Sequence, residues 1–263
     1  TIITARITSA PETRVPSTIV TGISPSAPTL PENLLKFYIH FSAPMSRGRI
    51  YDHIHLVRED GREIELPFLE IDEELWDAGM TRLTLFIDPG RIKRGVHPLE
   101  EIGPALEEGH SYQLRIDSKW KDANGAPLKQ SYESKFQVGA PDRTPIDPER
   151  WRIEPPNSGT RDALRIDFGE FLDHALAGRM IHVLHGENIA EGTVSLTRFD
   201  SAWEFTPESH WLPGEYKLAI EKTLEDLSGN NVGKPFDVDL FEGVKRRETS
   251  ATTTLTFHVS SGD

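Results

Sequence analysis

The feature that most constrains this chain is an internal repeat of one strand plan. Its first part repeats at an offset of 127 residues, its middle at 118 and its last part at 104. A sequence that repeats over this distance encodes one structural unit twice. The matched residues are Phe37 with Leu164, Ile39 with Ile166, Phe41 with Phe168, Met45 with Leu172, His55 with His182, Pro89 with Pro207, Tyr112 with Tyr216, and Asp122 with Asp226.

The repeated segments alternate apolar and polar residues, as strands with one buried face do. Leu35–Phe41 has all four of its odd-numbered positions apolar, and Arg82–Ile87, Tyr112–Ile116 and Thr252–Val259 behave similarly. Gly, Pro and Asp separate these runs, which is typical of antiparallel sandwiches. Long helical periodicity is missing, and a helical turn is expected only near residues 72–77 and 173–180. We predict an all-β chain of two tandem antiparallel β-sandwich domains.

The boundary between the domains is expected in residues 139–148, where three prolines in ten residues disfavour sheet pairing and stiffen the chain. We predict one domain over residues 1–140 and a second over residues 141–263. The first domain carries an enlarged loop at residues 90–108, because the offset falls from 118 to 104 between Pro89 and Tyr112.

This loop is expected to dock on the linker and on the second domain. Its apolar residues are too many for a free solvent loop, and Arg91 and Arg94 offer cations to carboxylates of the second domain. The loop would then fix the angle between the domains, and the pair would behave as one rod. The alternatives are a loop folded only on its own domain, or one facing an outside partner.

Composition excludes several classes of function. A net charge of −13 argues against nucleic-acid binding, which needs clustered Lys and Arg. The absence of cysteine excludes disulfides, thiolate metal sites and thiol nucleophiles. Apolar residues make up 37% of the chain, enough for packed cores, yet no run approaches the roughly 20 residues that cross a bilayer. The sequence begins at Thr1 without a visible charged-then-apolar leader.

Several short motifs recur in the same order in both halves. They are Phe41-Ser-Ala-Pro-Met45, the strand ends Asp88-Pro89 and Thr206-Pro207, the approaches to Tyr112 and Tyr216, and the turn Asp226-Leu-Ser-Gly-Asn230 with its altered copy Asp122-Ala-Asn-Gly-Ala126. In this order they resemble the bacterial Ig-like family of surface-layer and other exported proteins. The second half departs at Phe168-Gly-Glu-Phe-Leu172, where the Ser and Pro of the pattern are lost.

The resemblance implies Ig-like domains, and it carries over no catalytic residue. It implies a non-enzymatic spacer, scaffold or adhesion element of a bacterial protein that is extracellular, on the cell surface or in the periplasm. Its partners would be an envelope component, a glycan or other protein domains. The alternative is an accessory carbohydrate- or peptide-binding module, and a second alternative is an uncharacterised hydrolase.

The usual catalytic motifs are absent from the sequence, including the nucleophile elbow, the zinc-protease helix, the phosphate loop and the dinucleotide fingerprint. We therefore predict neither an enzyme nor a cofactor. Two groups of residues are candidate metal sites. His53 and His55 alternate on one strand and could begin a zinc site, but no third ligand is evident. The acidic run over residues 70–77 lacks the calcium-loop pattern. Both are better explained as solvated surface.

Three tryptophans are the best candidates for ligand binding. Trp76, Trp120 and Trp211 stand next to expected turns, where exposed rings could stack on sugars. The other interpretation is that they fill the ends of the two cores, because large aromatic side chains supply much of the burial in small domains. We favour the second interpretation. Exposure of the three rings discriminates between a binding module and a spacer.

Overall fold

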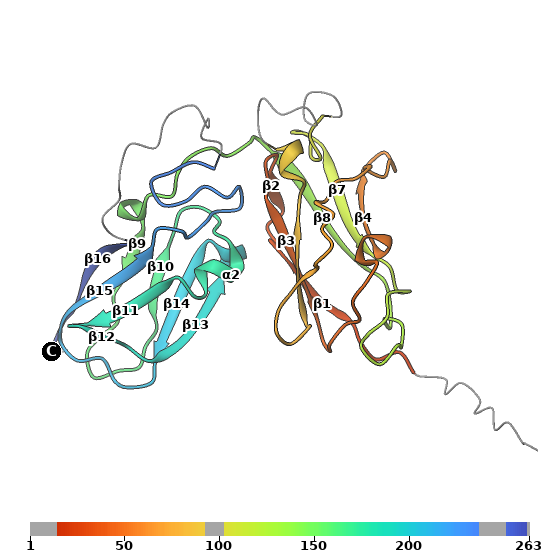
Figure 1. Ribbon diagram of the computed structural model, residues 1–263. Helices are drawn as coiled ribbons and strands as arrows, with labels where there is room; N and C mark the ends of the chain where they lie inside the picture. The colour runs from red at the N-terminus through yellow and green to blue at the C-terminus, as the bar shows by residue number, and fades with distance from the viewer. Residues whose placement is uncertain (1–14, 93–102, 237–250, 262–263) are drawn as a thin grey trace, which may run out of the picture.

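The computed structural model describes residues 15–92, 103–236 and 251–261. Within these residues nearly every regular element is a strand (Figure 1), and no helix has the length and apolar character to span a membrane. The α-helix named α2 is a single turn, His174–Ala177. The 3-10 turns are η1 Ile50–His53, η2 Pro89–Arg91, η3 Pro148–Arg150 and η4 Arg198–Asp200.

The N-terminal half has two sheets of four strands, in the orders β1-β3-β6-β5 and β2-β8-β7-β4. All pairs are antiparallel except β2 with β8, which run parallel over three residues. The expected purely antiparallel sandwich therefore has one parallel edge. The strands are β1 Val20–Ser24, β2 Thr29–Pro31, β3 Lys36–Phe41, β4 Ile54–Arg58, β5 Leu75–Trp76, β6 Arg82–Phe86, β7 Ser111–Ile116 and β8 Tyr132–Gly139.

The C-terminal half repeats most of this plan with sheets β13-β14-β10-β9 and β12-β11-β15-β16, but its short strand β12 lies beside β11, whereas β2 lies beside β8. The pairs between these strands are antiparallel. The strands are β9 Arg152–Glu154, β10 Leu164–Asp167, β11 Ile181–His185, β12 Asn188–Ile189, β13 Gly192–Thr197, β14 Ala202–Pro207, β15 Gly214–Glu221 and β16 Thr252–Val259.

Each half has its own hydrophobic core between its two sheets. The alternating residues that the sequence places inside are buried in both copies: Phe37, Ile39 and Phe41 in the first, and Leu164, Ile166 and Phe168 in the second. An apolar side chain this deeply buried contributes about 1.5–3 kcal/mol relative to exposure. The predicted fold class, Ig-like antiparallel β-sandwich, is confirmed.

The repeat also holds at the level of single contacts. Tyr112 lies on β7 and Tyr216 on β15, and each hydroxyl accepts a hydrogen bond from a backbone N–H four or five residues upstream. This is the corner that Ig-type sandwiches use to fix the loop before that strand. Asp122 bridges Met45 as Asp226 bridges Leu172. The expected pairing of Tyr112 with Tyr216, and of Asp122 with Asp226, is therefore confirmed.

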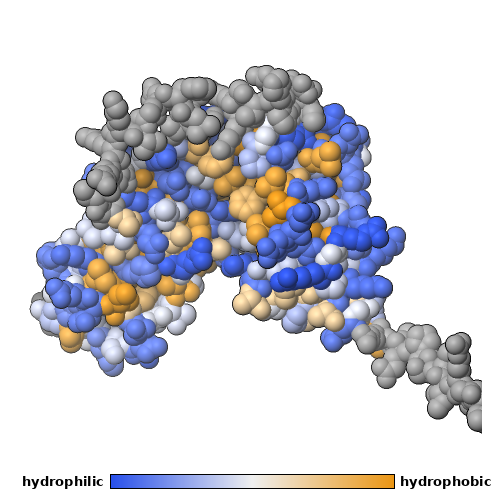
Figure 2. All heavy atoms as spheres, viewed as in Figure 1, coloured by the Kyte–Doolittle hydropathy of each residue, from blue (hydrophilic) through white to orange (hydrophobic). Residues whose placement is uncertain are grey.

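The two halves lie side by side below the linker, like the arms of an inverted V (Figure 1). The pair is thus bent rather than straight. α2 lies on the side of the C-terminal half that faces β2 and β3. Figure 2 shows apolar side chains gathered where the two halves adjoin.

Candidate functional site at the junction of the two halves

The outward face of β3 is covered by the other half. Lys36, Tyr38 and His40 alternate with core residues, so the sequence pattern places them toward solvent. Lys36 is only 8% exposed, however, and Tyr38 only 5%. The repeat-equivalent of Tyr38 is Arg165 on β10, which is exposed. Because two repeats of one plan differ here, the burial belongs to this junction and not to the fold of a single half.

Asp173 receives two side chains of β3 at the entrance to α2. Its carboxylate caps α2 by accepting from the Leu176 N–H at 2.9 Å. The Tyr38 hydroxyl donates to both of its oxygens at 2.9 Å, and Lys36 Nζ lies 3.1 Å from Oδ2. Lys36 also bonds Glu225, with Nζ and Oε2 2.5 Å apart. Such ion pairs fix the relative position of two surfaces, because a shift would leave one of the two charges buried without its partner.

Burial and the adjacent Asp173 carboxylate raise the pKa of Tyr38 well above its usual range. The phenol therefore stays protonated and remains a donor to Asp173 across the physiological pH range. Lys36 also lies over the ring of Phe86, 5.6 Å from its centroid. Arg82 lies over the Tyr38 ring in the same way, at 5.4 Å. The charged groups of the junction are thus packed against aromatic faces as well as against carboxylates.

The turn of residues 226–230 inserts into the N-terminal half. Leu227 is 8% exposed and packs in the core cluster of that half, and its carbonyl accepts from the Leu35 N–H at 2.9 Å. Gly229 has φ +81°, and a Cβ on it would meet Leu35 Cδ2 at 2.7 Å. Glycine is needed here twice, for its left-handed backbone and for its missing side chain. Phe171 and Phe236 pack beside Leu227.

A pair of amide contacts ties the linker to both halves. Asn33 donates to the Asp142 carbonyl at 2.6 Å and accepts from the Asp142 N–H at 2.8 Å. Asn33 also accepts from the Ser228 hydroxyl, and Asn230 donates to the same Asp142 carbonyl. Further along, Ile146 is 1% exposed and forms a bridge with Val232. The linker is therefore fastened along its length rather than merely stiff.

Two histidines meet across the junction. The ring of His40, on β3, lies edge-on to the ring of His174, the first residue of α2, with centroids 5.6 Å apart. His174 Nδ1 lies 2.9 Å from Asp200 Oδ1. His40 Nε2 and Asp200 Oδ2 are both buried without a hydrogen-bond partner. Burying an imidazole nitrogen and a carboxylate oxygen without partners costs free energy.

The electrostatics of the two rings differ. Burial, with His174 and Arg82 nearby, lowers the pKa of His40. The hydrogen bond that His174 makes to the Asp200 carboxylate raises the pKa of His174. Asp200 ends a run of three left-handed residues, with φ of 51°, 60° and 70° at positions 198–200. This backbone costs about 1–2 kcal/mol per residue, and it is what brings the Asp200 carboxylate under His174.

Three carboxylates converge beside the linker. Asp142, Glu170 and Asp226 offer oxygens that lie within 4.8 Å of one another, and no other such group of three occurs in the described part of the chain. Burial, followed by the neighbouring carboxylates, raises the pKa of Glu170 to about 8. Burial likewise raises the pKa of Asp226 to about 7, although the hydrogen bonds from Asn230 lower it. Oxygen ligands of this kind suit Ca²⁺ or Mg²⁺, which would offset the repulsion between the three carboxylates. A proton shared between two of them relieves that repulsion as well.

The three tryptophans fill cores instead of forming a binding face. Trp120 is 1% exposed and Trp211 is 2% exposed, so neither ring can stack on a sugar. Trp76 is half-buried against Phe41 and Trp120, and its Nε1 donates to Glu74. Their assignment as binding residues is therefore corrected. Large flat rings at the ends of a sandwich are better buried than hydrated.

The two candidate zinc ligands do not converge. His53 stacks on Trp120 with ring centroids 5.8 Å apart, whereas His55 Nδ1 pairs with Glu63. Neither belongs to a group of three metal-binding side chains in the described residues. The acidic run is also used locally, because Glu74 accepts from Gly48 N–H and Asp77 accepts from Thr81 and Arg82 N–H.

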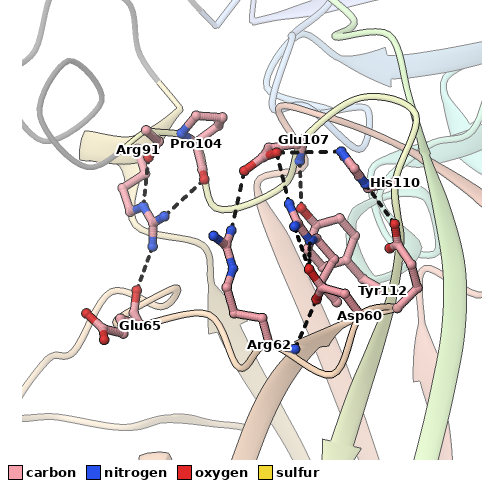
Figure 3. Close-up of polar contacts among 11 residues, drawn as sticks. Asp60, Arg62, Glu65, Arg91, Pro104, Glu107, His110 and Tyr112 are labelled. Carbon is pink, nitrogen blue, oxygen red and sulfur yellow. Dashed lines mark hydrogen bonds and ion pairs between the residues drawn. The ribbon is translucent and has the colours of Figure 1, made fainter.

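Arg91 does not reach toward the C-terminal half. Its guanidinium is buried and donates to the carbonyls of Glu65, Leu66, Gly103 and Pro104, all in its own half (Figure 3). The other end of the loop is held by Tyr112 and by Glu107, which lies between Arg62 and His110 (Figure 3). The described ends of the loop thus fold on their own domain. Arg94 and the middle of the loop lie outside the described residues.

A groove of about 620 Å³ lies on the outer face of sheet β2-β8-β7-β4. Its lining is mixed, with Val57, Gln113 and Lys135 side by side across three strands. It contains none of the candidate site residues.

The sequence reasoning missed the residues that form the junction. Lys36, Tyr38 and His40 look like ordinary solvent-facing residues of an alternating strand. One signal was available: the repeat-equivalent positions are Ala163, Arg165 and Asp167, so the outward face of this strand differs completely between the copies. Leu227 offered a second signal, because an apolar residue in a tight turn stands where the first copy has Ala123.

The fold and junction define an all-β protein made of Ig-like sandwiches. No protein-family model matches the chain, and no curated protein matches it. The solved structures that match the chain do so at low identity and low TM-score. A fragment of Escherichia coli alpha-2-macroglobulin spanning domains MG0-NIE-MG1 is 9% identical, with TM-score 0.29, and the match covers 92% of this chain and 71% of that one.

The S-layer protein rSbsC(31-844) is 8% identical with TM-score 0.31, over 94% of this chain and 41% of that chain. A chimeric titin Z1Z2 is 10% identical with TM-score 0.26, over 94% of this chain and 97% of that one. Likenesses of this size carry no information about what the present chain binds.

Proposed function

We propose that this chain is a non-enzymatic spacer or scaffold segment of an exported bacterial protein, in which two Ig-like domains are held at a fixed, bent angle. The domains are residues 1–140 and 141–263. The envelope or the cell surface is the proposed location, in keeping with the motif order shared with bacterial Ig-like proteins. Proteins or glycans of the envelope would be the partners.

The observation that carries this proposal is the burial of the outward face of β3. A flexible tether needs no buried ion pair, yet Lys36 and Tyr38 are both withdrawn from water to meet Asp173. Domain pairs in one chain usually move relative to each other unless their interface is large or specifically locked. The junction supplies such a lock with Leu227, Asn33 and the β3 side chains. A fixed angle suits a protein that sets the distance and direction between other parts.

The accessory binding module is the weaker alternative, because its tryptophans are buried. A carbohydrate- or peptide-binding role would fall to the groove beside Val57, Gln113 and Lys135, whose lining is mixed in character. The hydrolase alternative gains no support from the positions of the candidate residues either. The spacer proposal accounts for more of the structure.

NMR relaxation tests the proposal directly. In the whole chain, backbone ¹⁵N relaxation should give both halves one common tumbling time. The double variant Lys36→Met, Tyr38→Phe removes the donors to Asp173 and should let the halves tumble separately. The control variant Lys217→Met changes an exposed lysine on β15 and should behave as the unmodified chain. Separate tumbling times in the unmodified chain would overturn the proposal.

A further inference from the structure

A pocket in the N-terminal half contains two buried side-chain nitrogens that have no hydrogen-bond partner. The pocket has a volume of about 400 Å³ and lies between η1 and the turn that follows β7. Its lining includes the stacked rings of His53 and Trp120, whose centroids are 5.8 Å apart. His53 Nδ1 and Trp120 Nε1 are both buried without a partner in the described part of the chain. Because an indole nitrogen only donates, this site lacks an acceptor.

The charged side chains of the pocket are mainly cationic. Arg49, Lys119 and Lys121 line it together with one carboxylate, Asp52, so the lining carries three positive charges and one negative charge. Arg49 pairs with Asp52, whereas neither lysine has an ion pair within the described residues. In a chain of net charge −13, a surplus of two positive charges in one pocket is a local exception. A surplus of this size attracts a doubly charged anion.

The fold itself does not require the two nitrogens. The repeat-equivalents of His53 and Trp120 are Met180 and Leu224, and Leu224 is fully buried. An apolar side chain therefore fills this corner of the sandwich in the second copy. The unpartnered nitrogens belong to the pocket of the first copy and not to the plan that the two copies share.

The same corner of the second copy holds a charged group from outside its own domain. The backbone of the corner is equivalent in the two copies, because Ser46 N–H donates to the Lys121 carbonyl as Asp173 N–H donates to the Glu225 carbonyl. Asp173 and Glu225 are acidic, and they hold the ammonium of Lys36 from the other half. The first copy has serine and lysine at these positions, so the charge of the corner is reversed. A corner that binds a cation in one copy is thus suited to an anion in the other.

We propose that this corner of the N-terminal half is a binding pocket for a phosphate group. The ammonium groups of Lys119 and Lys121 supply the charge, and the ring N–H groups of His53 and Trp120 donate to phosphate oxygens. Phosphate fits better than a carboxylate, because it is close to a dianion at pH 7 and offers three or more acceptor oxygens. The inference goes beyond the spacer role, and it does not depend on the angle between the halves.

A titration of the whole chain with inorganic phosphate, followed by ¹⁵N NMR at constant ionic strength, tests the pocket. The reporter is the indole N–H signal of Trp120, assigned by triple-resonance spectra. This signal should shift and reach saturation, because the indole gains an acceptor. Acetate, titrated in the same way, should bind with a dissociation constant about tenfold or more higher, since it carries a single charge.

A third titration, with glycerol 3-phosphate, identifies the source of the phosphate. Saturation with both compounds would support a pocket for phosphomonoesters. Saturation with inorganic phosphate alone would support a pocket for the free ion.

Two double variants of equal charge separate the pocket from a general effect of charge. Lys119→Met, Lys121→Met should weaken phosphate binding by about tenfold or more, because charge-assisted hydrogen bonds are the strong ones. The control variant Lys135→Met, Lys217→Met removes two exposed lysines, on β8 and β15, and should bind as the unmodified chain does.

Three results would overturn the proposal. The first is a Trp120 indole signal that shows no saturable shift with either phosphate compound. The second is acetate that binds as tightly as phosphate, which would make the pocket a general carboxylate site. The third is an equal loss of affinity in the two double variants.

Discussion

Lys36 is a single side chain that links the two halves. It stands on the outward face of a strand, where a lysine normally reaches water, yet it is 8% exposed and its ammonium contacts Asp173 and Glu225. Burying an ion pair is not in itself stabilising, because desolvation offsets much of the attraction. Removing one partner is another matter, since the remaining carboxylate is then buried without its cation.

Lys36→Met is therefore expected to lower the free energy of unfolding by about 3 kcal/mol, at the low end for breaking a buried pair, because Asp173 keeps its bonds from Tyr38 and Leu176. Urea denaturation measures the change. Lys217→Met, on an exposed position of β15, should stay within about 0.5 kcal/mol of the unmodified chain. Equal effects of the two substitutions would mean that the Lys36 contacts do not stabilise the folded chain.

The carboxylates beside the linker predict an unusual pH dependence. The pKa of Glu170 is raised from 4.5 to about 8, so the folded chain holds this proton more tightly than the unfolded chain. The stability that this provides is fully present below about pH 4.5 and is lost as the pH rises toward 8. With EDTA present, the urea midpoint should therefore fall between pH 6.5 and pH 8.5.

Glu170→Gln carries no titrating proton and should reduce this fall, leaving only the part that comes from Asp226. The exposed Glu133→Gln on β8 is the matched control and should leave the fall unchanged. If Glu170→Gln follows the same pH curve as the unmodified chain, the crowding of these three carboxylates does not govern stability.

At the scale of the element, the turns before β8 and β16 show one motif put to two uses. In both, the Asp side chain accepts backbone N–H groups two and four residues on. Gly125 has φ +80° and Gly229 has φ +81°, so both need glycine equally. Gly125 belongs to a turn that bridges its own half at Met45, whereas a Cβ on Gly229 would strike Leu35 of the other half.

Alanine substitutions at these two glycines therefore distinguish the cost of backbone strain from the cost of a clash at the junction between the halves. Gly125→Ala should cost about 1 kcal/mol, the ordinary penalty for a left-handed alanine, and leave the domain angle intact. Gly229→Ala should cost at least twice as much and also loosen the junction. Urea denaturation gives the first quantity and ¹⁵N relaxation the second. Identical behaviour of the two variants would contradict the docking of this turn on Leu35.

The elements themselves were largely predictable. Alternation in Leu35–Phe41 and in Thr252–Val259 indicates strands, and the repeat carries that interpretation from one half to the other. The single turn of α2 was expected near residues 173–180, whereas the acidic run near residues 72–77 forms the short strand β5 instead of a helical turn. Trp120 and Trp211 are buried, as the interpretation that we favour expects, and Trp76 is half-buried.

The junction was not predictable, for a physical reason. Periodicity reports which residues of a strand face the core of their own domain, and it says nothing about a second surface that covers the opposite face. Tyr38 and His40 therefore look solvent-facing, and Arg91 looks free to reach another domain. Arg91 instead finds four carbonyls in its own half, which satisfy its donors more cheaply than distant carboxylates would.

At the scale of the whole molecule, the two halves form one bent unit. Core packing explains each half, and the contacts of β3, α2 and the turn of residues 226–230 explain their angle. The chain has 29 basic and 42 acidic residues, so its net negative charge favours separation of the two halves. A closed junction therefore requires specific contacts that oppose this electrostatic repulsion. Those contacts are the basis of the spacer proposal.

A distance measurement between the halves tests the fixed angle most directly. The chain has no cysteine, so Lys135→Cys on β8 and Lys217→Cys on β15 introduce two unique sites for spin labels. At pH 7.5, double electron–electron resonance should give a single narrow distance distribution, which broadens when Lys36→Met and Tyr38→Phe are added. A broad distribution in the chain with an intact junction, unchanged by those two substitutions, would contradict the fixed angle.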